Sequence, residues 1–396
     1  MKIAIVKERR PYERRVAASP DSVKQLKGLG LDVVVESGAG AGAFFLDSAY
    51  EAVGAAIAAD EAAALDGADI VLKVQRPLLD SGEQPDELKL MKKGAVLIGL
   101  LAPLEHADEV AAYAEAGITA MSMELVPRIT RAQSMDVLSS QANLAGYKAA
   151  VDAAAEFGRA MPMMMTAAGT IKAARVLVMG AGVAGLQAIA TARRLGGVVF
   201  ATDVRAAAKE QVESLGANFL MVDAEAMKSA ETAGGYAREM GEDFQRRQRQ
   251  MITDALKRID IVICTALIPG RKAPVLLTAE MLGAMAPGSV VADIAVDSGG
   301  NVEGSKPEET VTTPGGVKII GYANAPAHIP VDASLLYARN LSAFLALLVD
   351  KEKGLKIDTS DEIIKAALLT MDGAVVNPAL APTSADTSPS ATPAAG

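Results

Sequence analysis

The segment from Arg175 to Asp203, RVLVMGAGVAGLQAIATARRLGGVVFATD, constrains the fold more strongly than any other part of the chain. It opens with a run of apolar and small residues, Val176 to Gly180, which suits a strand buried on both faces of a parallel sheet. A glycine-rich turn, a helical pattern over Val183 to Arg194 and a second apolar run follow. Strand, turn, helix and strand in this order predict a βαβ unit and therefore a parallel α/β sheet.

The glycines give this turn a more specific meaning. Gly180, Gly182 and Gly185 have the spacing G-x-G-x-x-G. In a dinucleotide site the first glycine permits a tight turn, the second lets the backbone approach the pyrophosphate, and the third lets the helix pack closely on the strand. Asp203 follows at roughly the 20-residue distance expected of a carboxylate that binds the adenosine ribose hydroxyls. The combination favours a dinucleotide site over a purely structural turn. The carboxylate favours NAD over NADP, because it would repel a ribose 2′-phosphate.

Length and composition exclude several classes of protein. At 396 residues the chain is long enough for two or three domains. A net charge of −9 argues against nucleic acid as a partner, because phosphates require a basic surface. The single cysteine, Cys264, lies in a largely apolar run, Ile261 to Leu267, and is predicted to be a core residue. Because the chain has only two histidines, we expect no metal site.

The two ends of the chain and its most apolar window also bear on its location. The N-terminus, MKIAIVKERR, lacks the apolar region and cleavage site of a secretory signal. The nearest approach to a membrane span, Val176 to Ala192, is broken by glycines. We therefore expect a soluble intracellular protein. The residues from 382 to 396 are almost all small, polar or proline and are expected to be a disordered tail.

Strand and helix patterns alternate over the N-terminal part of the chain, which predicts an α/β domain. The predicted strands are Lys2 to Val6, Leu31 to Glu36, Ile70 to Val74, Ala95 to Ile98 and Ile118 to Met121. The predicted helices begin at Pro20, with Ser19 as the cap, and cover Asp86 to Lys92 and Glu105 to Ala116. No glycine fingerprint accompanies this alternation, so this layer is predicted to be Rossmann-like without an evident nucleotide.

The alternation resumes after the fingerprint and predicts a second Rossmann-like domain. The expected elements are a helix over Ala206 to Leu215 and strands over Phe219 to Val222, Asp260 to Thr265, Val290 to Ile294 and Val317 to Gly321. A long helix over Ser134 to Arg159 is expected to bridge the domains. The polar stretch from Asp223 to Arg258 is predicted to be a lid or binding loop, with a surface helical hairpin as the alternative.

Two further helical patterns, Val331 to Val349 and Asp361 to Leu369, come after the second sheet should be complete. We expect them to return to the first sheet. The predicted fold is therefore α/β, with two Rossmann-like, doubly wound parallel-sheet domains, the first completed by C-terminal helices. The first domain is predicted to comprise residues 1–133 and 331–381, and the second residues 134–330.

The densest polar cluster outside the fingerprint lies in PRITRAQSMDVLSSQANLAGY, where a loop is predicted to enter the bridging helix. Its members are Arg128, Arg131, Gln133, Ser134, Asp136 and Ser139. Such amide, carboxylate, guanidinium and hydroxyl groups can hold a carboxamide and a ribose without supplying a strong acid or base. The same pattern suits a capped helix start with solvated polar residues, and spacing alone leaves both interpretations open.

Several motifs together make the chain resemble a known family. RAQSMD with LSSQANLAGY, PMMMTAAGT, MGAGVAGLQA, TDVR and ETAGGYAREM resemble the soluble NAD(H)-binding component of the proton-translocating NAD(P) transhydrogenases, within the wider alanine dehydrogenase superfamily. The match runs from KERRPYERRVAASP to about Pro378. The resemblance implies NAD(H) as the cofactor, two Rossmann-like domains with the first completed by C-terminal helices, and a homodimer.

The resemblance also implies roles for individual residues. The positions around the nicotinamide and its ribose are Arg128, Gln133, Ser134, Met135, Asp136 and Ser139. The pyrophosphate positions are Gly180, Ala181, Gly182 and Val183, the adenosine-side positions are Asp203, Val204 and Arg205, and Leu267 follows the strand that ends at Thr265. Gly235, Tyr236 and Gln248 match the family's mobile loop, about residues 223–258. Gln133, Arg128 and Asp136 are expected to be catalytic by orienting the ring, and Arg205 is expected at the surface or stacked on the adenine.

An amino-acid dehydrogenase such as alanine dehydrogenase is the closest alternative. Those relatives hold a 2-oxo acid with an arginine and a lysine, which Arg15 and Lys73 match, and move protons with a histidine, where this chain has Leu100. Leucine cannot carry the proton that reductive amination requires, and His106 lies on the wrong turn. We therefore expect Arg15 and Lys73 to be structural. A second alternative is an NAD-sensing protein without redox chemistry.

The reaction implied by the resemblance needs no general acid or base. Hydride exchange between NADH and NADP⁺ moves no proton at the carbon centres, so catalysis is expected to consist of proximity and orientation. Because the chain has one fingerprint, the NADP(H) site and the proton path are expected on an NADP(H)-binding subunit and a membrane-spanning subunit. The chain is then expected to be cytoplasmic and attached peripherally to the inner membrane through these partners.

Overall fold

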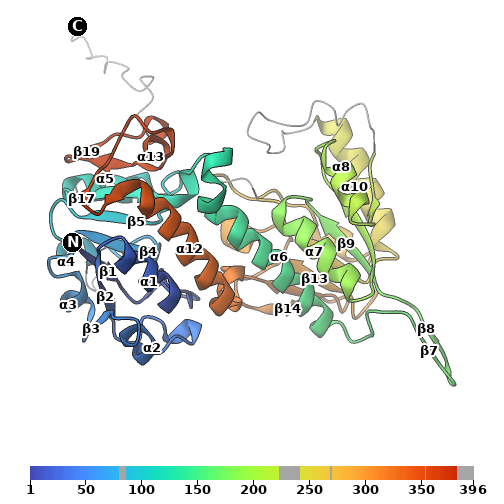
Figure 1. Cartoon of the computed structure of the whole chain (residues 1–396). Coiled ribbons are helices and arrows are strands. Elements are labelled where there is room, and N and C mark those ends of the chain that lie inside the picture. The colour runs from blue at the N-terminus through green and yellow to red at the C-terminus, as the bar shows by residue number, and fades with distance from the viewer. Residues whose placement is uncertain (80–85, 223–240, 268–269, 353, 381–396) are drawn as a thin grey trace, which may run out of the picture.

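The computed structural model describes residues 1–79, 86–222, 241–267, 270–352 and 354–380. Two sheets with helices packed on them lie side by side, and the long helices α6 (Val137–Glu156) and α12 (Pro330–Leu348) run between them (Figure 1). This arrangement confirms the predicted α/β fold with two Rossmann-like layers. The residue boundaries of the two domains stay a prediction, and the predicted tail lies outside the described residues.

The first sheet has six parallel strands in the order β3-β2-β1-β4-β5-β6. The strands are β1 (Lys2–Ile5), β2 (Asp32–Glu36), β3 (Ala56–Ala58), β4 (Ile70–Gln75), β5 (Val96–Leu100) and β6 (Thr119–Ser122). The predicted strands are confirmed to within two residues at each end. The edge strand β3 was not predicted, because three residues are too few to show a period.

Short helices connect these strands. They are α1 (Pro20–Gly28), α2 (Asp47–Glu51), α3 (Glu61–Leu65), α4 (Glu87–Leu90) and α5 (Ala107–Glu115), with 3₁₀ turns η1 (Ala41–Ala43) and η2 (Met123–Leu125). Ser19 caps α1 as predicted, because its hydroxyl accepts the backbone N–H of Ser22. The helix predicted over Asp86 to Lys92 is shorter, since Asp86 is its cap and Met91 already has extended backbone angles.

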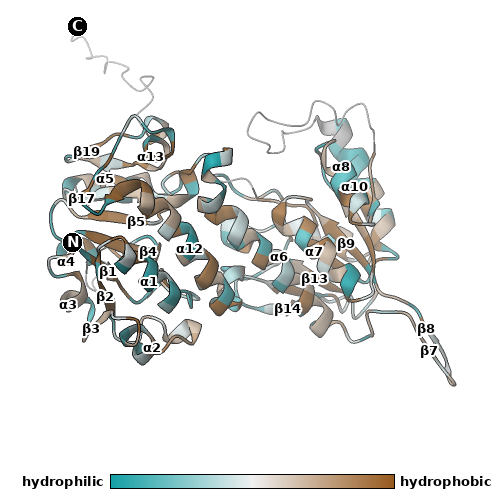
Figure 2. Cartoon of the chain, viewed as in Figure 1, coloured by the Kyte–Doolittle hydropathy of each residue, from teal (hydrophilic) through white to brown (hydrophobic). Residues whose placement is uncertain are grey.

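The C-terminal helices return to the first sheet, as predicted. Tyr337, Leu341 and Phe344 of α12 are fully buried in the same core as Ile3 and Ile70 of the strands. Apolar residues accordingly concentrate on the strands and on α12 (Figure 2). The helix is long and apolar enough to cross a membrane by composition, but more than half of its apolar window is buried inside the protein. The remaining elements are α13 (Glu362–Ala367), η6 (Pro378–Leu380) and the short pairs β16 (Val349–Asp350) with β17 (Gly354–Leu355) and β18 (Thr370–Met371) with β19 (Ala374–Val375).

The second sheet has seven strands in the order β11-β10-β9-β12-β13-β15-β14, and only β14 is antiparallel to its neighbour. The strands are β9 (Arg175–Met179), β10 (Val198–Thr202), β11 (Asn218–Phe219), β12 (Ile261–Cys264), β13 (Val290–Asp293), β14 (Thr310–Thr312) and β15 (Lys318–Gly321). Every predicted strand is present, although β11 is shorter than expected. Cys264 is fully buried, which confirms its assignment to the core.

The helices of the second domain are α7 (Val183–Arg194), α8 (Ala208–Ser214), α10 (Glu242–Leu256) and α11 (Ala279–Leu282), with η4 (Val296–Ser298) and η5 (Ala325–His328). The predicted start of α6 at Ser134 is wrong. The turn η3 (Thr130–Met135) comes first, and the helix begins after Asp136, whose carboxylate accepts the backbone N–H of Ser139. An aspartate is stabilised at this position because it caps an otherwise unpaired N–H.

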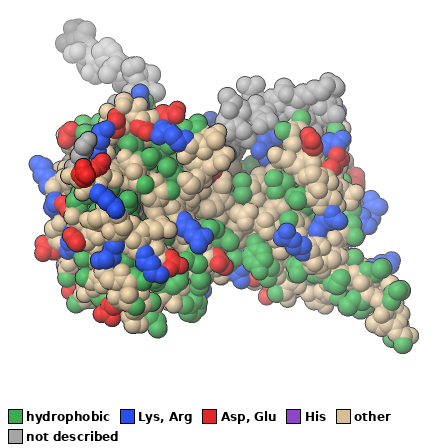
Figure 3. All heavy atoms as spheres, viewed as in Figure 1, with side chains coloured by type: hydrophobic (Ala, Val, Ile, Leu, Met, Phe, Trp, Pro, Cys, Tyr) green, Lys and Arg blue, Asp and Glu red, His purple; other side chains and the backbone are tan. Residues whose placement is uncertain are grey.

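A two-stranded hairpin, β7 (Met164–Thr166) with β8 (Gly169–Ile171), extends away from the second domain (Figure 1). Its strands are exposed throughout, and the space-filling view shows hydrophobic side chains along this arm (Figure 3). Neither strand was predicted, because a segment exposed on both faces has no buried face to impose a period.

Candidate nucleotide site

The carboxyl ends of β9 and β12 form the topological switch point of the second sheet. From β9 the chain continues to β10 and β11 on one side, and it later returns to β12 on the other. Ligands of open parallel sheets bind in the crevice at such a point. Gly180 follows β9 here, and Thr265 follows β12.

The three fingerprint glycines are each required for a different reason. Gly180 has a φ of +98°, and a Cβ on it would lie 2.8 Å from the hydroxyl of Thr265. A Cβ on Gly185 would lie 1.9 Å from the carbonyl oxygen of Gly180, so α7 packs directly on the turn. Gly182 differs, because a Cβ there would meet nothing within 4 Å. It is the N-cap of α7 without a side-chain cap, which leaves the first amides of the helix open to an anion.

Asp203 lies where the fingerprint predicts it, at the end of β10, but its carboxylate already has protein partners. Oδ2 accepts the N–H of Ala181 at 2.7 Å, and Arg205 forms an ion pair with it at 2.8 Å. Burial acts to raise the pKa of Asp203, but Arg205 outweighs it and holds the pKa below its ordinary value. The expectation that Arg205 is a surface residue is wrong, since only 20% of its side chain is exposed.

The predicted nicotinamide cluster lies on η3 and the first turn of α6. Asp136 accepts the backbone N–H of Ser139 at 2.9 Å and its hydroxyl at 2.6 Å, so the capped-start interpretation of this segment is correct. Gln133, Ser134 and Arg128 are exposed. They therefore remain accessible to a ligand, and the capped start does not exclude a binding role.

Met135 is the member of this cluster whose side chain is turned away from solvent. It is 5% exposed and packs with Val137 in the core of the first domain. Close packing joins the cluster's helix to the fingerprint helix. A Cβ on Gly146 of α6 would lie 1.9 Å from the carbonyl oxygen of Ala184 at the start of α7. The two halves of the predicted site thus rest on a shared helix pair.

The remaining predicted residues lie around the same edge or outside the described chain. Val204 is half-buried beside Asp203, and Leu267 is 48% exposed after β12. Gln248 is half-buried on α10, whose Ile252 and Leu256 are buried in the core. This part of the predicted mobile loop is therefore a packed helix. Gly235 and Tyr236 lie outside the described residues, as does the segment 223–240.

Arg15, one of the two dehydrogenase-like residues, is occupied by an internal carboxylate. It is 4% exposed, forms an ion pair with Glu13 at 2.8 Å, and donates to Gln141 at 2.8 Å and Asn324 at 3.0 Å. Burial acts to raise the pKa of Glu13, but Arg15 outweighs it and lowers the pKa to about 2. Arg15 therefore ties the loop after β1 to α6 and to the loop after β15.

Lys73 is likewise enclosed. It is 1% exposed, with its ammonium 2.7 Å from Glu87 and 3.8 Å from Glu8. Burial raises the pKa of Glu8 to about 7, although Lys73 acts to lower it, and burial also raises the pKa of Glu61 nearby to about 7. This buried glutamate cluster was missed from the sequence, because its members come from separate elements. Both dehydrogenase-like cations thus have structural partners, as expected.

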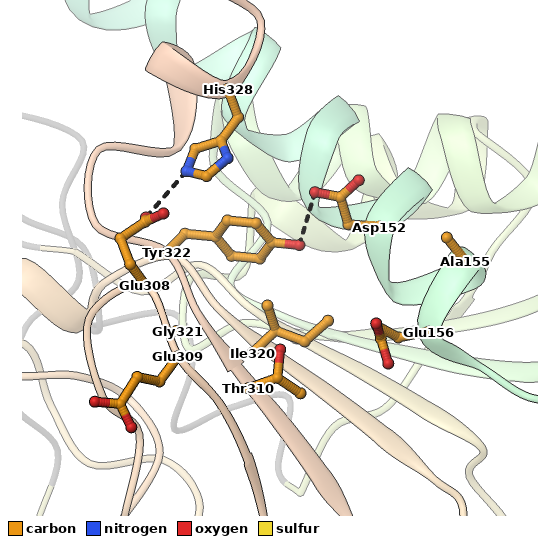
Figure 4. Close-up of a pocket in the computed structure, with 10 residues that line it drawn as sticks. All are labelled: Asp152, Ala155, Glu156, Glu308, Glu309, Thr310, Ile320, Gly321, Tyr322 and His328. Carbon is orange, nitrogen blue, oxygen red and sulfur yellow. Dashed lines mark hydrogen bonds and ion pairs between the residues drawn. The ribbon is translucent and has the colours of Figure 1, made fainter. Parts of the chain in front are cut away.

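A pocket of about 280 Å³ lies away from the fingerprint, between α6 and the edge of the second sheet (Figure 4). Its lining includes the carboxylates Asp152, Glu156, Glu308 and Glu309. The hydroxyl of Tyr322 donates to Asp152 at 3.1 Å, and His328 lies 3.0 Å from Glu308. Four acidic groups would repel the phosphates of a dinucleotide. We therefore assign the nucleotide to the fingerprint edge, where the helix amides are open. Among the described residues, no group of histidine, cysteine and acidic side chains is arranged to hold a metal.

Two parallel-sheet domains, of which the second has an open dinucleotide turn at its switch point, define a nucleotide-dependent oxidoreductase of the two-domain Rossmann type. Residues 4–145 match the family described as "alanine dehydrogenase/PNT, N-terminal domain" and residues 149–378 the corresponding C-terminal domain. The chain therefore belongs to the alanine dehydrogenase/PNT family, and within it to the NAD(P) transhydrogenase alpha subunits.

Individual relatives support this placement. The first of the chains that make up the NAD(P) transhydrogenase alpha subunit of Rhodospirillum rubrum is 58% identical over 96% of this chain and 99% of its own. The crystal structure of transhydrogenase from Sinorhizobium meliloti is 51% identical, with a TM-score of 0.84 over 95% of this chain and 100% of its own. Alanine dehydrogenase of Bacillus subtilis is 30% identical over 96% of this chain and 94% of its own. The predicted resemblance is confirmed.

Proposed function

We propose that this chain binds NAD(H) and exchanges a hydride directly with NADP(H) held on a partner subunit, in a transhydrogenase whose membrane partner translocates protons. The observation that carries the proposal is the open amide end of α7 at Gly182, on a helix that packs against the start of the RAQSMD helix. The similarity to transhydrogenase alpha subunits supports it.

The residues at the fingerprint edge fit a dinucleotide. The glycine turn with Ala181 and Val183 presents the amides that would hold the pyrophosphate, and Asp203 with Val204 and Arg205 lies on the adenosine side. Bound NAD(H) supplies the hydride. The chain's own contribution is to orient the nicotinamide ring, through Gln133, Arg128 and Asp136 with Ser134, Met135 and Ser139, and to exclude water. Leu267 and Gln248 are proposed to line the same site.

The competing function, amino-acid dehydrogenation, lacks its machinery here. Leu100 ends β5 where those relatives have a proton-carrying histidine, and Arg15 and Lys73 are engaged by Glu13 and Glu87. The purified chain, mixed with NADH, ammonia and pyruvate, is expected to leave NADH unoxidised. Robust oxidation in this assay would refute the transhydrogenase proposal.

The exchange itself is tested by adding an NADP(H)-binding subunit. With that partner present, hydride transfer from NADPH to an NAD analogue is expected, measured by the absorbance of the reduced analogue. Persistent inactivity with a partner that is competent with another alpha subunit would favour an NAD-sensing protein. We propose that the complex places this chain on the cytoplasmic side, attached to the inner membrane through its partners.

We propose further that the chain is a homodimer, with the β7–β8 hairpin as the contact. Met163 and Met165 are 62% and 80% exposed, and Ile171 on the second strand is 37% exposed. Exposed apolar side chains on a projecting arm are typical of protein interfaces. The variant Met165→Lys is expected to shift the sedimentation coefficient from dimer to monomer. An unchanged dimer in this variant and in Met163→Lys would exclude the hairpin.

A further inference from the structure

The loop that follows β12, residues 266–274, is clamped at both ends by one buried side chain. Asn301 is fully buried, and its Oδ1 accepts the N–H of Ala266 at 3.0 Å. Its Nδ2 donates to the carbonyl oxygens of Ala266 at 2.9 Å and Pro274 at 2.8 Å. A single amide thus closes the base of the loop, which restricts the freedom of the described residues between its ends.

The clamp is itself anchored in the core of the second domain. Asp293, at the end of β13, is fully buried. Its Oδ2 accepts the backbone N–H of Asn301 at 3.0 Å and of Val302 at 3.1 Å. The position of the loop is therefore set by a core strand, at the same sheet edge as the fingerprint turn.

The clamped loop presents an apolar and a basic surface at the cleft between the domains. Leu267 is 48% exposed, and Arg271 and Lys272 are exposed without an ion pair or side-chain hydrogen bond among the described residues. Gly270 has a φ of +70°, and a Cβ on it would lie 2.9 Å from the Cβ of Leu104 in the first domain. A pocket of about 210 Å³, lined in part by Glu105, opens beside the two cations.

We propose that this loop is the docking site for an acidic surface of the NADP(H)-binding partner. The inference rests on the proposed function, because direct hydride transfer requires the two nicotinamide rings to touch. The partner must therefore contact the rim of the fingerprint edge, of which the loop is a part. The chain as a whole carries a charge of −9, so two adjacent unpaired cations on this rim give a local field of opposite sign. Such complementarity steers association more than it stabilises the complex.

Charge reversal tests this docking surface. In the double variant Arg271→Glu with Lys272→Glu, the concentration of NADP(H)-loaded partner that half-saturates hydride transfer is expected to rise by about tenfold or more at low salt. The maximal rate and the affinity for NADH, measured by NADH fluorescence, are expected to stay unchanged. The matched control is Lys257→Glu with Arg258→Glu, an exposed basic pair that precedes β12 at the opposite edge of the sheet.

The outcomes separate this inference from the proposed function. A double variant that titrates with the partner as the wild type does, or a control pair that loses as much, overturns the docking site. Binding of the partner to the wild type, measured by calorimetry, is read independently of turnover. If the wild type binds the partner but transfers no hydride, the proposed function fails, and the effect of the charge reversal on calorimetric affinity still decides the docking site. Absence of both binding and transfer overturns both proposals.

Discussion

Replacing Glu8 with glutamine is expected to reduce the loss of stability that the chain undergoes as the pH rises through neutrality. The Glu8 side chain is 2% exposed, and its Oε1 accepts the N–H of Val74 at 2.6 Å. Lys73 lies 3.8 Å away but is closer to Glu87, at 2.7 Å. One buried cation thus serves two carboxylates, and Glu13 adds further negative charge. Glutamine preserves the size of the side chain and its acceptor while removing the ionisation.

The size and sign of the effect follow from the pKa of Glu8. Burial raises this pKa from 4.5 to about 7 in the folded chain. Between these two values the folded state binds more protons than the unfolded state, so the free energy of unfolding falls as the pH rises. The stabilising contribution is complete below pH 4.5 and is lost above about 7. A displacement of this size corresponds to about 3 kcal/mol.

Urea unfolding, followed by circular dichroism at several pH values between about 5 and 8.5, measures the effect. The stability of Glu8→Gln relative to the wild type is expected to increase by about 3 kcal/mol over this range. The control Glu115→Gln changes an exposed glutamate of α5 in the same domain and is expected to follow the wild type. A stability difference between wild type and Glu8→Gln that is constant with pH would refute the argument.

Three further substitutions test the nucleotide edge. Gly182→Val is expected to weaken NADH binding by about tenfold or more without lowering the Tm, because its side chain enters space that the protein leaves open; unchanged fluorescence titrations would contradict this. Gly185→Ala is expected to destabilise the fold by about 1–3 kcal/mol or more, since its Cβ would lie 1.9 Å from the Gly180 oxygen, and an unchanged Tm would exclude that packing. Asp203→Ala is expected to weaken NADH binding by about tenfold and to improve NADPH binding relative to NADH, because Arg205 loses its partner; an unchanged ratio of the two affinities would refute its role in cofactor choice.

The parts of the fold that could be predicted are those specified by local pattern. Buried parallel strands give long apolar runs, and the fingerprint turn requires glycine at positions that are fixed relative to the strand before it. The edge strands β3 and β14 and the arm β7–β8 escaped, because short or exposed segments carry no such period. The start of α6 was misplaced because Asp136 stabilises a cap more than it extends a helix.

The arrangement of the site depended on contacts between distant segments, which the sequence does not display. Asp203 was placed correctly, yet its pairing with Arg205 follows from the turn after β10. Met135 was assigned with its polar neighbours, but its side chain packs in the first core. Asn301 could not be recognised at all, since the backbone groups that it clamps lie 27 and 35 positions away in the chain.

Helix α6 also works as a ruler between the two domains. Its first residue, Val137, is buried in the core of the first domain, and Ala149 and Ala153 are buried in the core of the second. A helix of 20 residues is about 30 Å long and does not stretch. The domains therefore cannot slide apart along this axis without unpacking one core. Any change in the width of the cleft must be a rotation about the helix, which leaves the nicotinamide cluster at its beginning at a constant distance from the fingerprint turn packed on its side.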